Sequence, residues 1–296
     1  MKKIGFYALA LLFCAFQTAC LRLDGLLYNP KKITEYKFDA YEGTENRVPS
    51  EYDIAADKIK LMTLTSDDDG KKETIYAEYV GDMARIATDT IILYAHGNAQ
   101  NMDLYWQRVK LLANVGGKNR YGVMTFDYRG YGLSEGTSTE SSMYADADAC
   151  LQWLKSKGLT SNRLVFYGFS LGTASATKLT AEPRTLTPAK LALEAPFASA
   201  EVMAQDASGL AIPGSFVTNL KINNAEMIKK VNQPLLWLHG VEDDFVAMKT
   251  HGEVVFKNYK GTRGTAVRVE GANHSTVPNT MGYPQYVATM LNFISK

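Results

Sequence analysis

The sequence predicts an α/β fold in which helices wrap a mainly parallel sheet. Three observations predict it: short apolar runs recur from residue 90 onward, helical patterns separate them, and two alternating segments precede them. A continuous apolar run is typical of a strand buried on both faces, whereas alternation is typical of a strand with one exposed face. The 296 residues suffice for one large domain or two small ones.

The alternating segments Lys58–Leu64 and Thr74–Val80 flank a turn at Ser66–Gly70, which predicts an antiparallel hairpin at the N-terminal edge of the sheet. The predicted buried strands are Thr90–Ala95, Gly122–Phe126, Arg163–Tyr167, Lys190–Leu193, Leu235–Leu238 and Ala266–Val269. The helical patterns are Asp103–Asn114, Ser142–Lys157, Thr173–Ala181, Asn224–Val231 and Lys249–Tyr259. This alternation predicts helices on both faces of a twisted parallel sheet, with ligands beyond the carboxyl ends of its strands.

Composition narrows the classes of function. The net charge is +1, so no basic field favours nucleic-acid binding. Hydrophobic residues make up 46% and charged residues 21%, which is ordinary for a globular protein. Cys150 is the only cysteine after residue 20, so no intramolecular disulfide is expected, and we interpret it as a buried small apolar residue.

The N-terminus does not share the pattern of the rest of the chain. Met1-Lys2-Lys3 is positively charged, Ile4–Phe16 is apolar, and Gln17-Thr18-Ala19-Cys20 follows. This segment resembles a bacterial lipoprotein signal peptide, in which cleavage before the cysteine leaves Cys20 as the lipidated N-terminus. The resemblance implies a signal peptide over residues 1–19 and a cell-envelope protein anchored to a membrane through Cys20.

Two alternatives stay open for this segment. Gln17 stands where a lipoprotein signal usually has an aliphatic residue. An ordinary secretory signal is one alternative, although Gln17 fits its small-residue rule poorly too. An uncleaved anchor is the other, although the apolar run is shorter than the roughly 20 residues that span a bilayer. Leu21 is no clear inner-membrane retention signal, which slightly favours the outer membrane. Residues 20–57 are polar and rich in tyrosine, and we expect a tether and a segment lying over a domain formed by residues 58–296.

Ser170 is the candidate nucleophile. It is the serine of Gly168-Phe169-Ser170-Leu171-Gly172, between a predicted strand and a segment that can open a helix. A Gly-x-Ser-x-Gly match alone is weak, but a strand-to-helix turn is the context of a nucleophile elbow. The two glycines fit this reading because a side chain at either position would crowd so sharp a turn.

A serine hydroxyl needs a base, and the chain has four histidines. His96 and His239 are expected to be structural, and His251 lies inside a helical pattern. His274 follows the predicted strand Ala266–Val269 and is the candidate base. An acidic loop after the strand at Leu235 offers three candidate acids, Glu242, Asp243 and Asp244.

The candidate nucleophile, the acidic loop and the candidate base follow one another along the chain, each after a predicted strand. In this order the sequence resembles a serine hydrolase of the α/β-hydrolase superfamily over residues 58 to 296. The family order of nucleophile, acid and base implies His274 as the base, and the pattern His-Gly-x-x-Asp implies Asp243 as the acid. Asp244 is the runner-up, with helix capping as its ordinary role. The loop His96-Gly97-Asn98-Ala99 implies an oxyanion hole made by the backbone N–H groups of Asn98 and Leu171. The loop from Asp127 to Gly136 also matches the superfamily and is interpreted as structural.

The resemblance implies acyl transfer through an acyl-enzyme on Ser170, acting on a small-molecule ester or thioester with a small to medium acyl group. No His/Cys spacing indicates a metal, and no cofactor is expected. An amidase or aminopeptidase on the same fold, and a non-catalytic binding protein on a hydrolase scaffold, are the alternatives. A short insert at about residues 198–222 would form either a small cap or acyl-pocket wall, or ordinary core.

Overall fold

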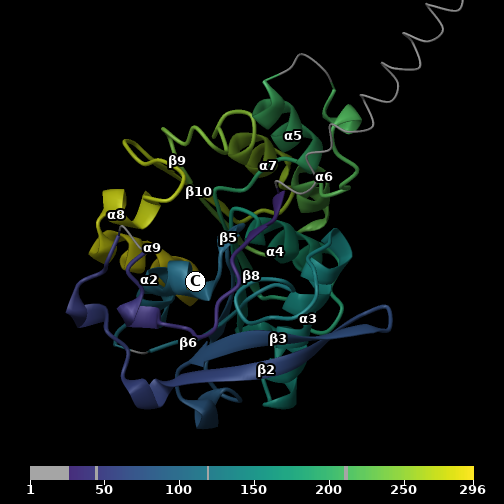
Figure 1. Ribbon diagram of the computed structural model, residues 1–296. Helices are drawn as coiled ribbons and strands as arrows, with labels where there is room; N and C mark the ends of the chain where they lie inside the picture. Colours follow the sequence, from purple (N-terminus) through teal and green to yellow (C-terminus); the bar gives the residue numbers. More distant parts are fainter. Residues whose placement is uncertain (1–26, 44–45, 119, 210–212) are drawn as a thin grey trace, which may run out of the picture.

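A sheet of eight strands forms the centre of the computed structural model, which describes residues 27–43, 46–118, 120–209 and 213–296 (Figure 1). The strands are β2 (Ile59–Asp68), β3 (Lys71–Val80), β4 (Ile91–Ala95), β6 (Gly122–Phe126), β7 (Leu164–Phe169), β8 (Lys190–Glu194), β9 (Leu235–Gly240) and β10 (Gly264–Val269). They lie in the order β10-β9-β8-β7-β4-β6-β3-β2. Neighbours from β10 to β6 are parallel, whereas β3 runs antiparallel to both β6 and β2. The predicted mainly parallel sheet with an antiparallel hairpin is therefore confirmed.

The hairpin of β2 and β3 is longer than the sequence pattern predicts. A turn is predicted over Ser66–Gly70, but strand pairing continues to Asp68 and Lys71, so that only Asp69 and Gly70 form the loop. Both have positive φ, 52° and 88°, which is the conformation of a two-residue turn whose twist matches the strands. The predicted turn is wrong in length because acidic residues at the exposed end of a hairpin have the composition of a loop.

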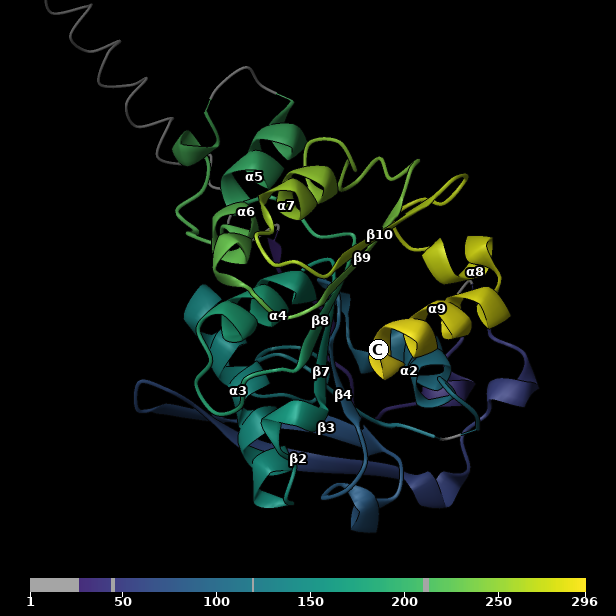
Figure 2. The same cartoon turned by 180° about the vertical axis from the view of Figure 1, so that it is seen from behind.

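Helices cover both faces of the sheet. They are α2 (Met102–Ala113), α3 (Glu140–Ser156), α4 (Gly172–Ala181), α5 (Ala200–Ser208), α6 (Asn224–Met227), α7 (Gly252–Asn258), α8 (Val277–Met281) and α9 (Tyr283–Ser295). Figure 2 shows α3, α4, α6 and α7 on one side of the sheet and α2, α8 and α9 on the other.

Two helix predictions need correction. The pattern Asn224–Val231 forms one short α-helix, α6, followed by a 3-10 turn at Ile228–Lys230. In the predicted helix Lys249–Tyr259, the observed helix begins only at Gly252, and residues 249–251 form a turn.

Strand β4 shows why the sheet is buried on both sides. Ile91, Leu93 and Ala95 belong to the hydrophobic cluster on one face, whereas Ile92 and Tyr94 belong to the cluster on the other. Successive side chains of a strand point to opposite faces, so a strand between two layers of helices must be apolar throughout. Because β4, β7, β8, β9 and β10 pair in parallel, their carboxyl ends lie along the same edge of the sheet.

The described part of the N-terminal extension lies against the domain. Asn29–Pro30 forms strand β1, which pairs in parallel with β5 (Ala99–Gln100). Farther along, Val48, Tyr52 and Ile54 are buried in the cluster that contains α2 and α9. The predicted signal peptide and Cys20 lie outside the described residues. Among the residues that are described, no helix is long and apolar enough to cross a membrane.

Candidate active site

Ser170 lies in the sharp turn between β7 and α4. Its φ is +51°, a left-handed conformation that L-residues other than glycine seldom adopt. The turn leaves no room for side chains on either flank: a Cβ on Gly168 would lie 2.6 Å from Gly172 O, and a Cβ on Gly172 would lie 2.0 Å from Ala95 O. The two glycines thus let the turn pack against its neighbours while it holds Ser170 in a strained backbone conformation.

Three side chains from three loops form one hydrogen-bonded chain. His274, from the loop after β10, has Nε2 2.9 Å from the Ser170 Oγ and Nδ1 2.8 Å from Oδ2 of Asp243. Asp243 follows β9. An ionised carboxylate can only accept, so Nδ1 carries the imidazole proton and Nε2 is left to accept from the serine hydroxyl. The structure thus brings together the three residues that the sequence analysis selects.

The carboxylate of Asp243 is held by four donors. Oδ1 accepts from the backbone N–H groups of Phe245 and Val246, at 3.1 and 2.7 Å. Oδ2 accepts from His274 and lies 3.2 Å from Nε2 of His239. Burial raises the pKa of Asp243, but the hydrogen bonds from His239, His274 and Val246 outweigh it and hold the pKa well below its usual value. Asp243 therefore stays ionised at neutral pH.

The other acidic candidates do not reach this chain. Asp244 and Glu242 are exposed, whereas Asp243 is 4% exposed. The capping role weighed for Asp244 is not seen either, because no helix begins near Ala247 and the N–H groups in that turn are bound by Asp243. Only Asp243 is placed to orient His274.

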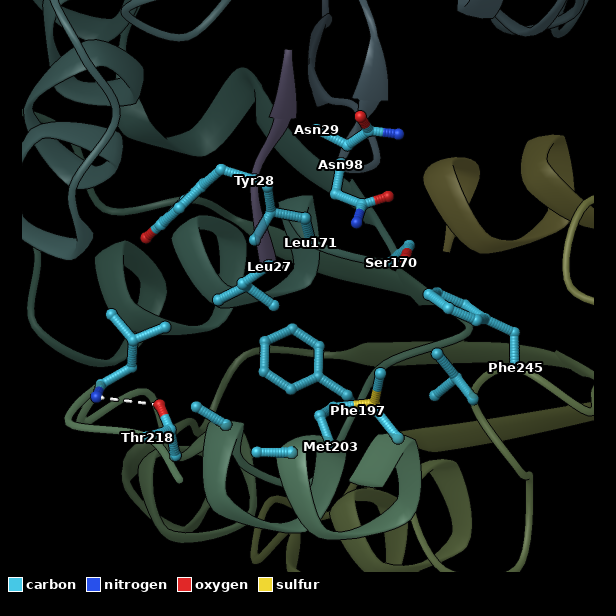
Figure 3. A pocket seen from close by; sticks show the side chains of 15 residues that line it. Leu27, Tyr28, Asn29, Asn98, Ser170, Leu171, Phe197, Met203, Thr218 and Phe245 are labelled. Atoms are coloured by element: carbon cyan, nitrogen blue, oxygen red, sulfur yellow. Dashed lines mark hydrogen bonds between the residues drawn. The ribbon is translucent and has the colours of Figure 1, made fainter. Parts of the chain in front are cut away.

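Asn98 and Leu171, the two predicted oxyanion-hole residues, lie beside Ser170. Both residues line the cavity beside the serine (Figure 3). Leu171 immediately precedes α4, where helix N–H groups lack partners within the helix. Within the described residues, neither the Asn98 N–H nor the Leu171 N–H donates a backbone hydrogen bond outside regular secondary structure. Both are therefore available to an oxygen atom held beside Ser170.

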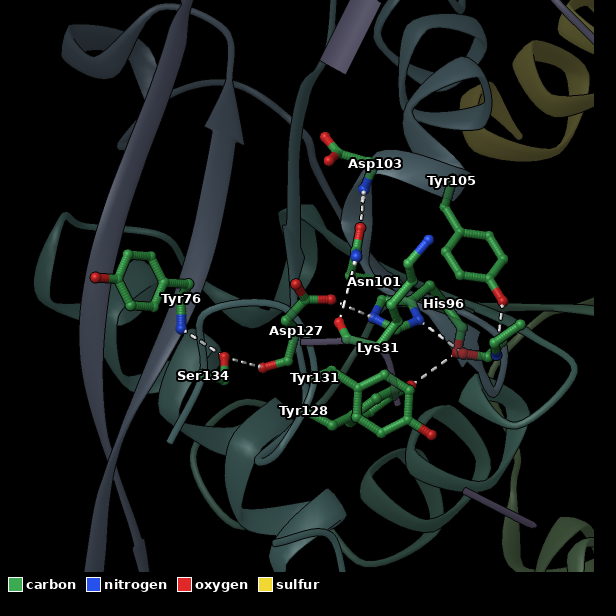
Figure 4. Close-up of polar contacts among 12 residues, drawn as sticks. Lys31, Tyr76, His96, Asn101, Asp103, Tyr105, Asp127, Tyr128, Tyr131 and Ser134 are labelled. Atoms are coloured by element: carbon green, nitrogen blue, oxygen red, sulfur yellow. Dashed lines mark hydrogen bonds and ion pairs between the residues drawn. The ribbon is translucent and has the colours of Figure 1, made fainter. Parts of the chain in front are cut away.

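The remaining histidines have partners away from Ser170. His96 is fully buried, with Nδ1 2.7 Å from Gly97 O and Nε2 3.1 Å from Oδ1 of Asp127 (Figure 4). His251 accepts from the Ala198 N–H and lies 3.0 Å from Asp206. His239 is the exception that the sequence analysis missed, because it contacts Asp243 although it lies one residue before the end of β9.

A cavity of about 490 Å³ opens beside Ser170 and is mostly apolar (Figure 3). Helix α5 contributes Ala200, Met203 and Ala204 to its wall, so the short insert predicted at residues 198–222 borders the site. Figure 3 shows Phe197 and Leu27 pointing into the same space. Sequence reasoning missed Leu27, because nothing in an irregular polar segment indicates that it folds back onto the site.

A second hollow of about 310 Å³ also reaches Ser170 and His274. Its lining is more polar and includes Asn46, Gln107 and Arg108. No Asp or Glu is found among the described residues that line either space. The described residues also contain no group of three His, Cys, Asp or Glu side chains placed to hold a metal ion.

Solved structures resemble the fold of this protein over most of the chain. An esterase from Pyrococcus furiosus superposes with a TM-score of 0.66 over 90% of this chain and 98% of its own, at 16% identity. An esterase from Rhodococcus sp. gives 0.59 over 80% of this chain and 98% of its own, at 18% identity. The protein has the α/β-hydrolase fold. At such low identity the likeness shows the fold alone.

Sequence comparison agrees with this fold. Residues 87–230 match the family model described as "Serine aminopeptidase, S33". Human alpha/beta hydrolase domain-containing proteins 17B and 17C are each 28% identical over 69% of this chain. The matched regions span 66% and 57% of those two relatives, less than two thirds of their length.

Proposed function

We propose that the protein is a serine hydrolase that cleaves a carboxylic ester or thioester through an acyl-enzyme on Ser170. One observation carries the proposal: the hydrogen-bonded chain Ser170–His274–Asp243 ends in an apolar cavity at a strained strand-to-helix turn. A hydroxyl that donates to an imidazole held by an ionised carboxylate is an activated nucleophile.

The steps follow from these positions. Nε2 of His274 takes the proton of Ser170 as Oγ attacks the carbonyl carbon, and the carbonyl oxygen becomes an oxyanion. The Asn98 and Leu171 N–H groups stabilise that oxyanion; losing one such donor typically costs roughly 3–4 kcal/mol in the transition state. Imidazolium then protonates the departing alcohol or thiol as its bond to carbon breaks. A water molecule, deprotonated by His274, hydrolyses the acyl-enzyme and restores the serine.

The cavity favours an apolar acyl group. Its walls come from leucine, phenylalanine, methionine and alanine side chains, which stabilise a hydrocarbon chain by removing it from water. Phe245 lines this space and is 52% exposed, so part of the cavity wall is in contact with solvent. We therefore propose a small to medium acyl group, with kcat/KM highest for esters shorter than long-chain lipids.

An aminopeptidase is the alternative that the matching family description suggests. An enzyme of that class must bind the charged α-amino group of its substrate, which calls for a carboxylate near the nucleophile. The described lining of both spaces beside Ser170 contains none. This absence favours an acyl ester or thioester over a peptide with a free amino terminus.

The proposal includes the cell envelope as the place of action. The N-terminal resemblance to a lipoprotein signal supports a lipid anchor at Cys20, which would hold the domain at a membrane surface. Mass spectrometry of the membrane-extracted protein tests this directly. A mature N-terminal peptide with acylated Cys20 is expected, and an unmodified Cys20 peptide would contradict it.

A fluorophosphonate probe tests the activity. Protein comprising residues 21–296 is expected to be labelled, whereas Ser170→Ala and His274→Ala are not. A panel of esters, thioesters and aminoacyl amides with one chromogenic leaving group would then rank the bond types. A folded parent protein that neither reacts with the probe nor turns over any ester would instead indicate a non-catalytic binding protein.

A further inference from the structure

The N-terminal segment contacts the candidate site at two places. Leu27, Tyr28 and Asn29 line the apolar cavity, although they precede Ser170 by more than 140 positions in the sequence. Asn29 also belongs to β1, which pairs with β5 directly after Asn98. The segment therefore reaches both the acyl side of the site and the loop that carries an oxyanion donor.

The Asn98 carbonyl lies at the centre of the second contact. It accepts from the Asn29 backbone N–H at 3.1 Å and from the Tyr131 hydroxyl at 2.9 Å. The Asn29 N–H also lies 3.1 Å from the Tyr131 oxygen, so the three groups touch one another. The Asn98 carbonyl lies in the peptide plane that it shares with the Ala99 N–H, so the two donors fix one side of the Asn98 Cα. The Asn98 N–H belongs to the preceding peptide plane, whose Gly97 carbonyl lies 2.7 Å from Nδ1 of His96. With a contact on each side of its Cα, Asn98 has little freedom to turn its N–H away from the site.

The residues that follow Asn98 are also held. The Ala99 N–H donates to the Tyr105 hydroxyl at 3.1 Å, and the Lys31 N–H donates to Gln100 O at 3.0 Å. Gln100 has a φ of +59°, which costs free energy for a residue with a side chain and persists only where the surroundings impose it. The pairing with β1 supplies part of that constraint.

We propose that residues 27–31 contribute to this hydrolase site, both to substrate selection and to the positioning of Asn98. Leu27 determines which acyl chains fit, and the Asn29 N–H acts with the Tyr131 hydroxyl to position the Asn98 amide for the oxyanion. Leu27 is thus a specificity residue, and Tyr131 is a positioning residue. The inference rests on the proposed function and adds to it an element that lies outside the matched region 87–230.

Leu27→Trp tests the specificity role. The larger ring should occupy part of the apolar cavity, so kcat/KM should fall about tenfold or more for the longest accepted acyl ester and stay within about twofold for the acetyl ester. Leu61→Trp is the matched control, because Leu61 is 36% exposed on the hairpin and lines neither cavity. An acyl-length profile identical to that of the parent would overturn this role.

Tyr131→Phe tests the positioning role. The Asn29 N–H still binds the Asn98 carbonyl in this variant, so the loop should stay folded while its amide becomes less fixed. We expect kcat to fall about tenfold with little change in KM, because an oxyanion donor acts mainly in the transition state. Tyr259→Phe is the matched control: its hydroxyl donates to Gln233 O at 2.6 Å, away from Ser170.

The outcomes separate this inference from the function on which it rests. A parent protein without serine-dependent turnover would overturn the proposed function itself. An active parent, with Tyr131→Phe at parental kcat and Leu27→Trp at the parental chain-length profile, would overturn the inference alone. Circular dichroism and thermal unfolding confirm that each variant is folded before its kinetics are compared.

Discussion

Oδ2 of Asp243 lies 2.8 Å from Nδ1 of His274 and 3.2 Å from Nε2 of His239, so two imidazoles converge on one carboxylate oxygen. The Trp237 indole N–H donates to Nδ1 of His239, which leaves the proton of that ring on Nε2. Nε2 of His239 therefore donates to Val246 O at 2.8 Å and lies within reach of the Asp243 carboxylate as well. His239 thus helps to hold the carboxylate that orients His274.

Asp243→Asn should remove this orientation without removing much volume. The amide presents an N–H₂ group or a carbonyl to Nδ1 and no longer stabilises the imidazolium, so kcat should fall roughly 10³- to 10⁴-fold. Asp244→Asn is the matched control, because Asp244 is the exposed neighbour. The measurement is the steady-state kcat of both variants and of the parent protein on its best ester substrate. Equal losses in both variants, or a larger loss for Asp244→Asn, would contradict the assignment.

The sequence predicts the candidate catalytic side chains better than it predicts the residues that line the cavity beside them. Ser170 and His274 could be selected because each follows an apolar run, and the carboxyl ends of parallel strands meet at one edge. The choice of Asp243 over Asp244 depended on a family pattern, since adjacent acids in a loop look alike in sequence. The hydrogen bonds of Asp243 to Phe245 and Val246 distinguish it only once the turn is folded.

The features that the sequence does not predict depend on contacts between distant segments. Strand β1 has two residues, too few for any period, and it forms only because β5 offers a partner 70 positions away. Helix α9 (Tyr283–Ser295) has no counterpart among the predicted elements, although it closes one face of the sheet. The roles of Leu27 and Tyr131 likewise depend on tertiary packing, which local composition does not record.

Gly172→Ala should disrupt the turn that holds Ser170. Its Cβ would lie 2.0 Å from Ala95 O and 2.8 Å from His96 O, both backbone atoms that cannot move aside as a side chain can. Forcing such contacts into a packed site costs about 1–3 kcal/mol or more, and the displaced turn would separate Ser170 from His274. We expect a lower Tm and at least about a 100-fold loss of kcat/KM, since a shift of about 1 Å can have that effect.

Gly70→Ala is the matched control for this substitution. Gly70 has a φ of +88° at the hairpin tip, with no atom within 4 Å of an added Cβ. Its replacement should lower stability by roughly 1–2 kcal/mol through backbone strain and leave the kinetics unchanged. A fully active Gly172→Ala protein would mean that the turn tolerates a side chain at this position.

Glu78 is a buried acid that the proposed mechanism does not use. It lies on β3 opposite Thr125 of β6 and is fully buried, and neither carboxyl oxygen has a hydrogen-bond partner in the described part of the chain. Burial is the main cause that raises the pKa of Glu78 well above its usual value. The negative charges of Asp103, Asp127 and Asp39 raise it further. The folded protein therefore keeps Glu78 protonated at pH values where the unfolded chain has lost that proton.

Glu78→Gln should therefore stabilise the protein increasingly as pH rises. Above pH 4.5, the usual value, the unfolded parent binds fewer protons than the folded parent, so its free energy of unfolding falls as pH increases. The loss is at most about 1.4 kcal/mol per pH unit, and it ends where pH passes the folded-state pKa. Glutamine does not titrate, so urea unfolding of variant and parent at pH 5, 6.5 and 8 should show a stability difference that grows in favour of the variant. Glu73→Gln, on the partly exposed part of the same strand, is the matched control for replacing a glutamate of β3 by glutamine. A difference between Glu78→Gln and the parent that is constant across this range would show that Glu78 has the same charge in the folded and unfolded states.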